Sequence, residues 1–463
     1  MVDPLFLSRI QFAFLIALHF LLPALTIGLA SYIAVLEGLF LWTKRPVYMR
    51  ISAFWIRIFS VSFGMGVVSG IVMPFQFGTN WSRYSEATAA IVAPLMGYEG
   101  LMAFFLEAAF LGVLLFGRKL VPPWAHFASA VIVACGTLLS AFWILAANSW
   151  MQTPAGYAVT NGQFVPTDWF SVIFSPSFPY RFLHTVTAVY LTTAFTVMGV
   201  AAWHVQRGRH MEESRIMIIM GFSLASVLVP LQAVLGDLHG VNTLEHQPAK
   251  LAAIEGLWET TRGAPAVLFA VPDQESQSNR GEIAIPKFGS LYLTHDWNGM
   301  VRGLKAFPRA DQPPVMPVFY GFRLMVAMWV CMLAFTLAAW WLGWRGKLFR
   351  SAWFMRALTW AVPTGYVAVT AGWITTEVGR QPWVVYNQLR TADAVTLTLG
   401  TSDVLISLFA YMLVYVVIFG AGLFYLARIV SEGVPAEVPG TTPTPAQRPA
   451  RPFSRATGRE AKS

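Results

Sequence analysis

Long apolar stretches recur along almost the whole chain, and they limit its possible folds more than any other feature. A helix needs about 20 mostly apolar residues to cross the roughly 30 Å hydrocarbon core of a bilayer. Only 12% of the 463 residues are charged, about half the share of an ordinary soluble protein. The sequence therefore predicts an all-α polytopic membrane protein and excludes a soluble globular enzyme. Nine transmembrane helices are predicted, centred on 12–41, 54–77, 91–116, 127–149, 182–204, 216–235, 318–341, 357–377 and 404–427.

Basic residues gather on alternate connections between these predicted helices. The connections after the first, third, fifth and seventh helices, together with the C-terminal tail, hold most of the Lys and Arg residues. The positive-inside rule then predicts the N-terminus outside and the C-terminus in the cytoplasm. The formal net charge of +9 is thus a topology signal, and nucleic acid is not an expected partner. The N-terminal MVDPLFLSRI lacks the basic region of a signal peptide, so a retained first helix is expected.

Two segments lie outside the predicted helices. Residues 237–317, between helices six and seven on the outer side, are far longer than a usual connection, and long loops are commonly functional. Residues 433–463 are rich in Pro, Thr, Ala and Arg and predict a disordered cytoplasmic tail. The chain therefore divides into helices one to six (1–236), an outer loop (237–317), helices seven to nine (318–432) and a tail (433–463).

Acidic residues at membrane depth are functional candidates, because each costs at least a few kcal/mol there. Glu99 and Glu107 are eight residues apart, so they lie roughly on one helix face and about 12 Å apart. Two such acids suggest proton transfer. The alternative is that each carboxyl is neutral and hydrogen-bonded to a neighbouring helix. Glu37, near the inner end of the first helix, is expected to reach to the interface instead.

His184 and Met325 open predicted helices five and seven, which run in the same direction, so both side chains lie near the outer face. A His/Met pair is a known axial ligation of low-spin heme. His19 and Glu377 also fall in the outer half, so a multi-heme cluster is geometrically possible there. Taken singly, Met325 also fits a packing role, each histidine fits a hydrogen bond, and Glu377 fits an ion pair with Arg380 three residues on.

Several short motifs occur in a consistent order along the membrane part of the chain. They are WILAANSWMQ at 143–152, KLAAIEGLWET at 250–260, FRLM at 322–325 and GRQPW at 379–383, with GYEG at 97–100 and LEAAF at 106–110. On these motifs the chain resembles subunit I of the cytochrome bd-type quinol oxidases, in the cyanide-insensitive oxidase branch. The outer loop lacks a long insertion in its second half, which resembles the members with a short quinol loop.

The resemblance implies a set of heme ligands. His184 and Met325 correspond to the axial ligands of a low-spin heme b. His19 and Glu377 correspond to the ligands of two high-spin hemes, one b and one d, and the sequence does not assign which heme each holds. A further heme b in place of heme d stays open. Arg323 and Arg380 are implied to stabilise heme propionates or the reduced centre.

The same resemblance implies the remaining sites and partners. Glu99 and Glu107 correspond to acids of the oxygen-reducing centre and its proton supply, and Lys250 and Glu255 to a quinol-binding pair in the outer loop. The implied activity is an electrogenic quinol:oxygen oxidoreductase of the bacterial cytoplasmic (inner) membrane, which releases protons outside and takes protons from the cytoplasm without pumping. Implied partners are quinol, dioxygen, the lipid bilayer, an integral subunit II and, in some complexes, a small single-helix subunit.

Two other functions remain open from the residues themselves. A heme-free ion-coupled transporter would use the buried carboxylates for protons or substrate, but no inverted repeat is apparent in the sequence. A transmembrane cytochrome b that only relays electrons would need His184 and Met325 but not His19 and Glu377 as ligands. A count of bound hemes distinguishes the three.

Overall fold

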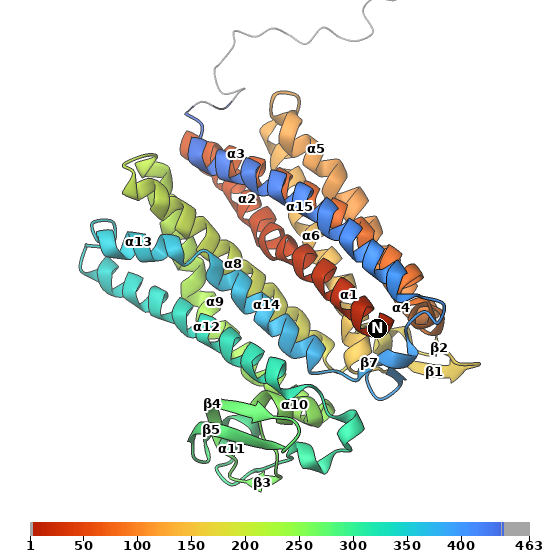
Figure 1. The fold of residues 1–463 in the computed structure, drawn as a ribbon. Coiled ribbons are helices and arrows are strands. Elements are labelled where there is room, and N and C mark those ends of the chain that lie inside the picture. Colours follow the sequence, from red (N-terminus) through yellow and green to blue (C-terminus); the bar gives the residue numbers. More distant parts are fainter. Residues whose placement is uncertain (1–2, 437, 439–463) are drawn as a thin grey trace, which may run out of the picture.

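Long helices lying side by side form most of the molecule (Figure 1). The computed structural model describes residues 3–436 and 438, so most of the predicted tail lies outside the described residues. Within the described part, eight helical stretches are long and apolar enough to cross a membrane, which confirms the polytopic α-helical class. These stretches are Pro4–Thr43, Pro46–Thr79, Ser82–Lys119, Pro123–Gln152, Trp169–Gln206, Met211–His246, Val315–Trp344 and Thr401–Glu432.

The bundle and its outer-end elements have the following bounds. The longer helices are α1 (Pro4–Leu21), α2 (Pro23–Thr43), α3 (Pro46–Thr79), α4 (Ser82–Met102), α5 (Ala109–Phe116), α6 (Pro123–Gln152), α8 (Phe178–Gln206), α9 (Met211–His246), α12 (Val315–Trp344), α13 (Ala352–Trp360), α14 (Pro363–Val378) and α15 (Thr401–Glu432). The shorter helices are η1 (Ala103–Ala108), η2 (Gly117–Lys119), α7 (Trp169–Ile173), α10 (Pro248–Glu255), α11 (Phe288–Thr294), η3 (Leu304–Ala306), η4 (Arg309–Asp311) and η5 (Thr391–Asp393). The strands are β1 (Tyr157–Thr160), β2 (Gln163–Pro166), β3 (Thr261–Arg262), β4 (Ala266–Asp273), β5 (Ser278–Ile285), β6 (Met300–Val301), β7 (Trp383–Val385) and β8 (Leu389–Arg390).

Prolines divide two of the predicted transmembrane helices. The first consists of α1 and α2, which meet at Leu22 because Pro23 has no N–H to continue the hydrogen-bond ladder. The predicted eighth helix consists of α13 and α14, and Pro363 begins α14. α13 and α14 are each shorter than a full membrane span, so the count of nine transmembrane helices stays a prediction. α14 packs between α8 and α12 (Figure 1).

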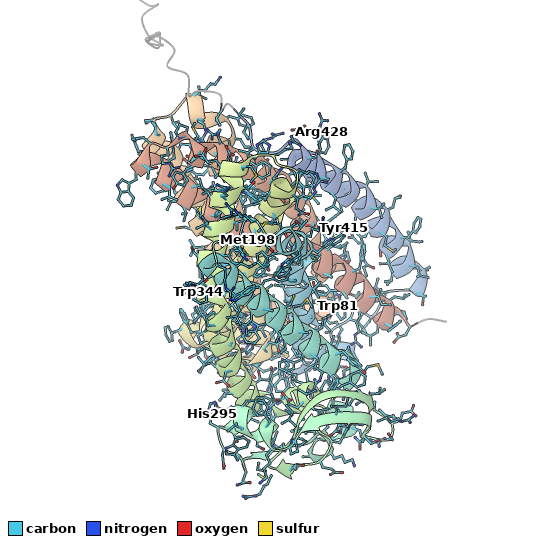
Figure 2. The ribbon with its side chains drawn as sticks, turned by 90° about the vertical axis from the view of Figure 1, so that its left-hand side faces the viewer. Trp81, Met198, His295, Trp344, Tyr415 and Arg428 are labelled. Atoms are coloured by element: carbon cyan, nitrogen blue, oxygen red, sulfur yellow. The ribbon has the colours of Figure 1, made fainter. Side chains whose placement is uncertain are left out.

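The connections predicted to be cytoplasmic lie together at one end of the bundle. Arg50 forms an ion pair of 2.7 Å with Glu213, and Arg57 one of 2.6 Å with Glu432 at the end of α15. Arg428 lies at this end and His295 at the opposite end (Figure 2). The N-terminus and the strands lie at the end that holds His295 (Figure 1). This grouping agrees with the predicted alternation of connections, whereas the orientation in the membrane stays a prediction.

Glu37 is buried inside the protein and does not extend to solvent, so the prediction that it reaches out to the interface is wrong. Its side chain is only 2% exposed. The carboxylate accepts hydrogen bonds from Ser52 and Arg118 and lies 3.1 Å from Nδ1 of His126. A buried carboxylate is tolerated where such partners surround it. The sequence did not reveal these partners because they come from α3, η2 and α6.

The segment predicted as an outer loop contains secondary structure of its own. α9 continues to His246, so its last turns fall within residues assigned to the loop. The KLAAIE run forms α10, and four two-stranded antiparallel sheets (β1–β2, β3–β6, β4–β5 and β7–β8) lie at this end of the bundle. Ala252 and Ile254 of α10 pack with Val267 of β4 and Phe319 of α12 in a small core. The loop is therefore fixed to the outer end of α12.

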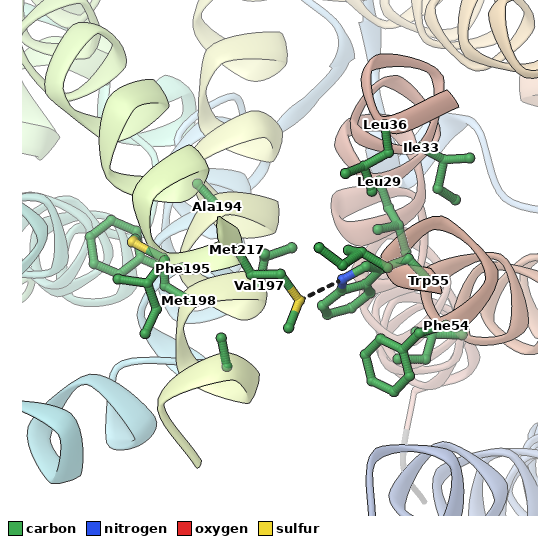
Figure 3. Close-up of a cluster of buried hydrophobic side chains, with 14 of the residues drawn as sticks. Leu29, Ile33, Leu36, Phe54, Trp55, Ala194, Phe195, Val197, Met198 and Met217 are labelled. Carbon is green, nitrogen blue, oxygen red and sulfur yellow. Dashed lines mark hydrogen bonds between the residues drawn. The ribbon is translucent and has the colours of Figure 1, made fainter. Parts of the chain in front are cut away.

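The main core lies where α2, α3, α8 and α9 meet (Figure 3). Trp55 of α3 donates from Nε1 to the sulfur of Met217 on α9 over 3.2 Å. Leu29, Phe195 and Met198 complete the packing and are all fully buried. This rigid centre holds the helices that carry the candidate site.

Candidate functional site

Glu99 and Glu107 lie on one helical stretch that changes type between them. α4 ends at Met102, and residues Ala103–Ala108 form the π-helix η1. Eight residues exceed two α-helical turns by about 0.8 residue. A π turn closes between residues five apart and takes up this excess, so it brings the two acids close to one face. Short π segments inside α-helices are frequent at functional sites.

Glu107 is held against α6. Its side chain is 6% exposed and accepts a hydrogen bond of 2.7 Å from the hydroxyl of Ser140. Gly136, one turn earlier on α6, makes the close approach possible. A Cβ at that position would lie 3.0 Å from Cγ of Glu107 and 2.9 Å from Cβ of Leu106. α6 therefore supplies both the partner and the space for this carboxyl.

His19 on α1 faces α3. Its Nδ1 lies 2.9 Å from the hydroxyl of Ser69, and a Cβ on Gly70 would lie 3.1 Å from its Cε1. The hydroxyl of Ser69 also donates to the carbonyl of Gly66 over 3.0 Å, so it can accept from the ring. Such a partner fixes the orientation of an imidazole that binds a metal through its other nitrogen.

His184 on α8 packs against one face of α9. Its Nε2 lies 3.1 Å from the side-chain nitrogen of Gln232, and its ring centroid lies 5.5 Å from that of His239. Gly236 lies between these two on α9 and leaves room for the ring. Within the described residues, Nδ1 of His184 is buried without a hydrogen-bond partner. A buried nitrogen of this kind is available to a metal ion or a bound group.

Met325 on α12 faces α14. A Cβ on Gly372 would lie 2.9 Å from its sulfur, so glycine is needed there for the side chain to fit. His184 and Met325 thus lie against different helices, α9 and α14. Each side chain could offer a ligand atom to a heme iron.

Glu377 lies at the end of α14 in a dense set of donors. It accepts hydrogen bonds of 3.1 Å from both Asn148 and Gln152 on α6. Arg380, three residues on, forms the ion pair that the sequence allows. Arg181 of α8 donates to Asn148 and so joins the same network. Glu377 is therefore oriented from three sides.

This network has more buried positive than negative charge. Arg181, Arg380 and Lys250 are 7%, 6% and 4% exposed, and Glu377 is the carboxylate that lies among them. Within the described part of the chain, Nε and Nη1 of Arg380 have no hydrogen-bond partner. Burial and the neighbouring Arg181 lower the pKa of Lys250 well below its usual range. An excess of buried cationic groups with unpartnered donor atoms favours an anionic group, and heme propionates fit this requirement.

Lys250 and Glu255 lie on α10 but face different neighbours. Lys250 donates 2.5 Å hydrogen bonds to the side-chain oxygens of Gln152 and Gln247. Glu255 accepts from the hydroxyl of Tyr292 on α11, while its second oxygen is buried with no partner among residues 3–436 and 438. Burial raises the pKa of Glu255. A carboxyl of this kind is suited to accept a proton.

Arg323 contacts the backbone of the outer loop. Its guanidinium donates to the carbonyl of Ile254 over 2.7 Å, to that of Val267 and to that of Phe319. It also lies 3.2 Å from the centre of the Phe319 ring. These contacts fix the end of α10, and hence Glu255, to α12. The implied contact of Arg323 with a heme propionate stays a prediction.

Several polar members of this region were not predicted from the sequence. Asn148 and Gln152 lie within the WILAANSWMQ motif, which was noted without a role, and Gln247 and Arg181 join them from outside it. The available signal was the i,i+4 spacing of two amides at the end of an apolar helix. Tyr292 and His239 gave no such signal, because their partners come from other elements.

A cavity of about 240 Å³ lies next to α10 at the outer end. His246, Arg302, Trp383 and Tyr386 line it together with Pro248 and Ala249, which precede Lys250. The cavity therefore combines aromatic faces and polar groups beside the predicted quinol-binding pair, as small-molecule sites often do.

Comparisons with known proteins agree with this arrangement. Residues 7–434 match the sequence profile of a family described as cytochrome bd terminal oxidase subunit I. The chain is 34% identical to cytochrome bd ubiquinol oxidase subunit 1 of Bacillus subtilis, over 93% of this chain and 94% of that one. It is 31% identical to cytochrome bd-II ubiquinol oxidase subunit 1 of Escherichia coli, over 96% and 100%. Its fold is similar to that of a bd oxidase from Geobacillus thermodenitrificans, with a TM-score of 0.86 and 29% identity over 93% of this chain and 99% of that one.

Proposed function

The chain belongs to the cytochrome bd terminal oxidase subunit I family, and on this basis we propose that it is the heme-bearing catalytic subunit of a terminal respiratory quinol oxidase. The observation that carries the proposal is one buried network. Gln152 connects Lys250, of the expected quinol site, with Glu377, an expected heme ligand. Substrate oxidation and metal ligation would therefore share one set of polar side chains.

Two hemes b and one heme d are the expected cofactors, and a further heme b in place of heme d stays open. His184 and Met325 would hold the low-spin heme b, and His19 and Glu377 the two high-spin hemes. When bound, the hemes supply the one-electron redox chemistry that joins quinol oxidation to dioxygen reduction. The unpartnered Nε and Nη1 of the Arg380 guanidinium support this assignment, because they would donate to propionates.

Quinol would bind at the outer end, beside α10. Oxidation of one quinol to quinone releases two electrons and two protons. Glu255 would accept a proton through its unpartnered oxygen, and Tyr292 would hold the other oxygen in place. Lys250 would hydrogen-bond a quinol oxygen. The protons would then leave to the outer side.

Reduction of one dioxygen to two waters consumes four protons, which match the four electrons of two quinols. Glu107 and Glu99 would pass these protons from the cytoplasmic side, with Ser140 holding the carboxyl of Glu107. The aligned acids of α4 and η1 support this route. Protons released outside and taken up inside would generate a gradient without a pump.

The named relatives also support expected partners and a location. They are subunits 1 of ubiquinol oxidases, so a second integral subunit is an expected partner of this chain, and a small single-helix subunit can join such a complex. The eight apolar helical stretches support a place in the cytoplasmic membrane of a bacterium.

A heme count tests the proposal directly. The purified complex is assayed as the pyridine hemochrome and by a reduced-minus-oxidised spectrum, with oxygen uptake measured on added quinol. Three hemes, with or without a chlorin band in the red, together with quinol-dependent oxygen uptake would support the oxidase. Absence of heme would leave the ion-coupled transporter, and heme without oxygen uptake would leave the electron relay.

A further inference from the structure

Polar side chains line the contact between α1 and α3 from the outer end inward. The two helices run in opposite directions, so residues on α1 meet residues of falling number on α3. The amide nitrogen of Asn80 lies 3.4 Å from the hydroxyl of Ser8 at the outer level. His19 and Ser69 pair over 2.9 Å at the inner level. These two contacts fix the register over roughly 16 Å of helix.

Gln11 and Gln76 lie on this contact, one turn inside the Ser8–Asn80 level. Both side chains are 0% exposed. The rings of their chain neighbours, Phe12 and Phe77, are 6.0 Å apart, which places the two glutamines at similar depth. Ser407 of α15 donates to the side-chain oxygen of Gln11 over 3.2 Å. Three helices therefore enclose the two amides.

Most of the polar atoms at this level have no protein partner. In the part of the chain that the structure describes, Nε2 of Gln11, both side-chain polar atoms of Gln76 and Nε1 of Trp81 are buried without a hydrogen bond. Such groups are normally paired with protein or with ordered water. These four atoms offer three donors and one acceptor, which suits one or two water molecules.

The amide level is connected to His19 by one apolar layer. Leu15 lies four residues after Gln11 and four before His19, and it packs with Met73 and Tyr415. Met73 is flexible and can move aside. The hydroxyl of Tyr415 donates to the carbonyl of Ser69 over 3.4 Å, so a polar group already borders this layer. Along the helix, Leu15 lies about 6 Å from the level of Gln11 and about 6 Å from the level of His19. A small neutral molecule would therefore cross only a short apolar distance between the two levels.

We propose that Gln11 and Gln76 bind water and form the outer part of the route by which water made at the expected high-spin heme centre, to which His19 would contribute a ligand, leaves toward the outer face. The inference rests on the proposed oxidase function, since each dioxygen reduced with four protons and four electrons yields two waters that must depart. A buried polar site needs partners even at rest, and exchanging water supplies them. The proposed route follows α1 and α3, whereas the acids expected to deliver protons lie on α4 and η1.

Structure determination of the heme-loaded complex in a lipid nanodisc, at a resolution that shows ordered water, is the first test. Density for water within hydrogen-bond distance of Gln76 and of Nε2 of Gln11 is expected. Direct pairing of the two amides, or their pairing with a heme propionate, would overturn the proposal. This measurement needs no variant, so a folding defect cannot obscure it.

Turnover of variants is the second test. Gln76→Leu is expected to lower kcat severalfold at saturating quinol and oxygen, with the quinol KM and all heme bands unchanged. Gln76→Glu keeps a polar group and is expected to retain most of kcat. Gln11→Met tests the same site from α1, should Gln76→Leu fail to assemble. An unchanged kcat in Gln76→Leu, or loss of a heme band, would contradict the route.

Phe409→Leu provides the matched control, because this α15 side chain is exposed at the surface of the bundle. It should leave kcat and spectra as in the natural chain. Failure of the proposed oxidase function has a different signature, since the natural complex would then lack heme or quinol-dependent oxygen uptake before any substitution is made.

Discussion

Lys250 and Glu377 are bound to the same side chain: Gln152 accepts from Lys250 at Oε1 and donates to Glu377 from Nε2. The two residues lie on α10 and α14, far apart in the sequence. A single amide at the end of α6 therefore connects the outer loop with the helix that carries an expected heme ligand.

Replacing Gln152 with leucine should destabilise the complex and slow quinol oxidation. The substitution leaves the buried Nζ of Lys250 and the carboxylate of Glu377 each short of one partner, and an unsatisfied buried group costs about 1–3 kcal/mol. Thermal unfolding of the purified complex and the rate of quinol-dependent heme reduction measure the two effects. Gln163→Leu, on the exposed strand β2, should change neither. Equal behaviour of the two variants would argue against a connecting role.

Quinol oxidation should lose rate toward acid pH as Glu255 becomes protonated. Burial raises the pKa of this carboxyl above its ordinary value of about 4.3. The acid limb of the pH–rate profile, where the rate falls, should therefore lie at higher pH than it would for a surface glutamate. Below that pKa the group already holds a proton and cannot accept one from quinol. Glu255→Gln should lower the rate and abolish the limb while leaving all heme bands.

Tyr292→Phe supplies the matched test of the same limb. The Tyr292 hydrogen bond lowers the pKa of Glu255, so its removal should move the limb to still higher pH. A pH profile of initial rates at saturating quinol measures the shift. A shift toward acid pH would mean that another group titrates.

Met325→Leu should remove the low-spin heme spectrum, because leucine offers no ligand atom to iron. The reduced-minus-oxidised spectrum of the purified complex measures this loss. Met316→Leu, an exposed methionine on the same helix, should leave the spectrum unchanged. An unaltered low-spin band in Met325→Leu would refute the ligand assignment.

Gly372→Ala should perturb the same low-spin heme band, although the substitution replaces no expected ligand residue. Its new Cβ would lie only 2.9 Å from the sulfur of Met325 and would push the side chain away from its position. A shifted band or a changed midpoint potential is expected in a redox titration. Gly343→Ala, where a Cβ meets nothing within 4 Å, serves as the control. If both variants titrate like the natural chain, Met325 has room to adapt.

Glu107→Gln should slow oxygen consumption much more than heme reduction by quinol. The amide cannot carry a proton, whereas the electron path from quinol does not include this residue. Stopped-flow reduction and steady-state oxygen uptake separate the two steps. Ser140→Ala should give a smaller effect in the same direction, because it removes only the 2.7 Å hydrogen bond to Glu107. Equal slowing of both steps would point to a general folding defect.

The sequence was sufficient for features that depend on local pattern. Apolar length predicted the helical stretches that could cross a membrane. The breaks at Leu22 and before Pro363 follow from proline chemistry, but apolar length alone concealed them. The prediction for Glu37 failed because burial depends on partners from three other elements.

The candidate site was only partly visible in the sequence for the same reason. The ligand types and the acids came from motifs, which are short and continuous. The amides and cations that orient them, such as Asn148, Gln152 and Arg181, act through contacts between distant helices. No spacing rule along one chain segment encodes such a meeting.

The π-helix η1 makes the alignment of Glu99 and Glu107 a matter of backbone winding. If these residues were all kept but wound as a regular α-helix, every side chain beyond them would turn by about 100° around the helix axis and move by about 1.5 Å along it, and Glu107 would no longer face Ser140. Deleting one residue, for example Ala103, would remove the residue that the π turn takes up. The two acids would then be seven positions apart on an α-helix, again close to one face. In relatives of this chain, the length of this segment is therefore as informative as the identity of the acids.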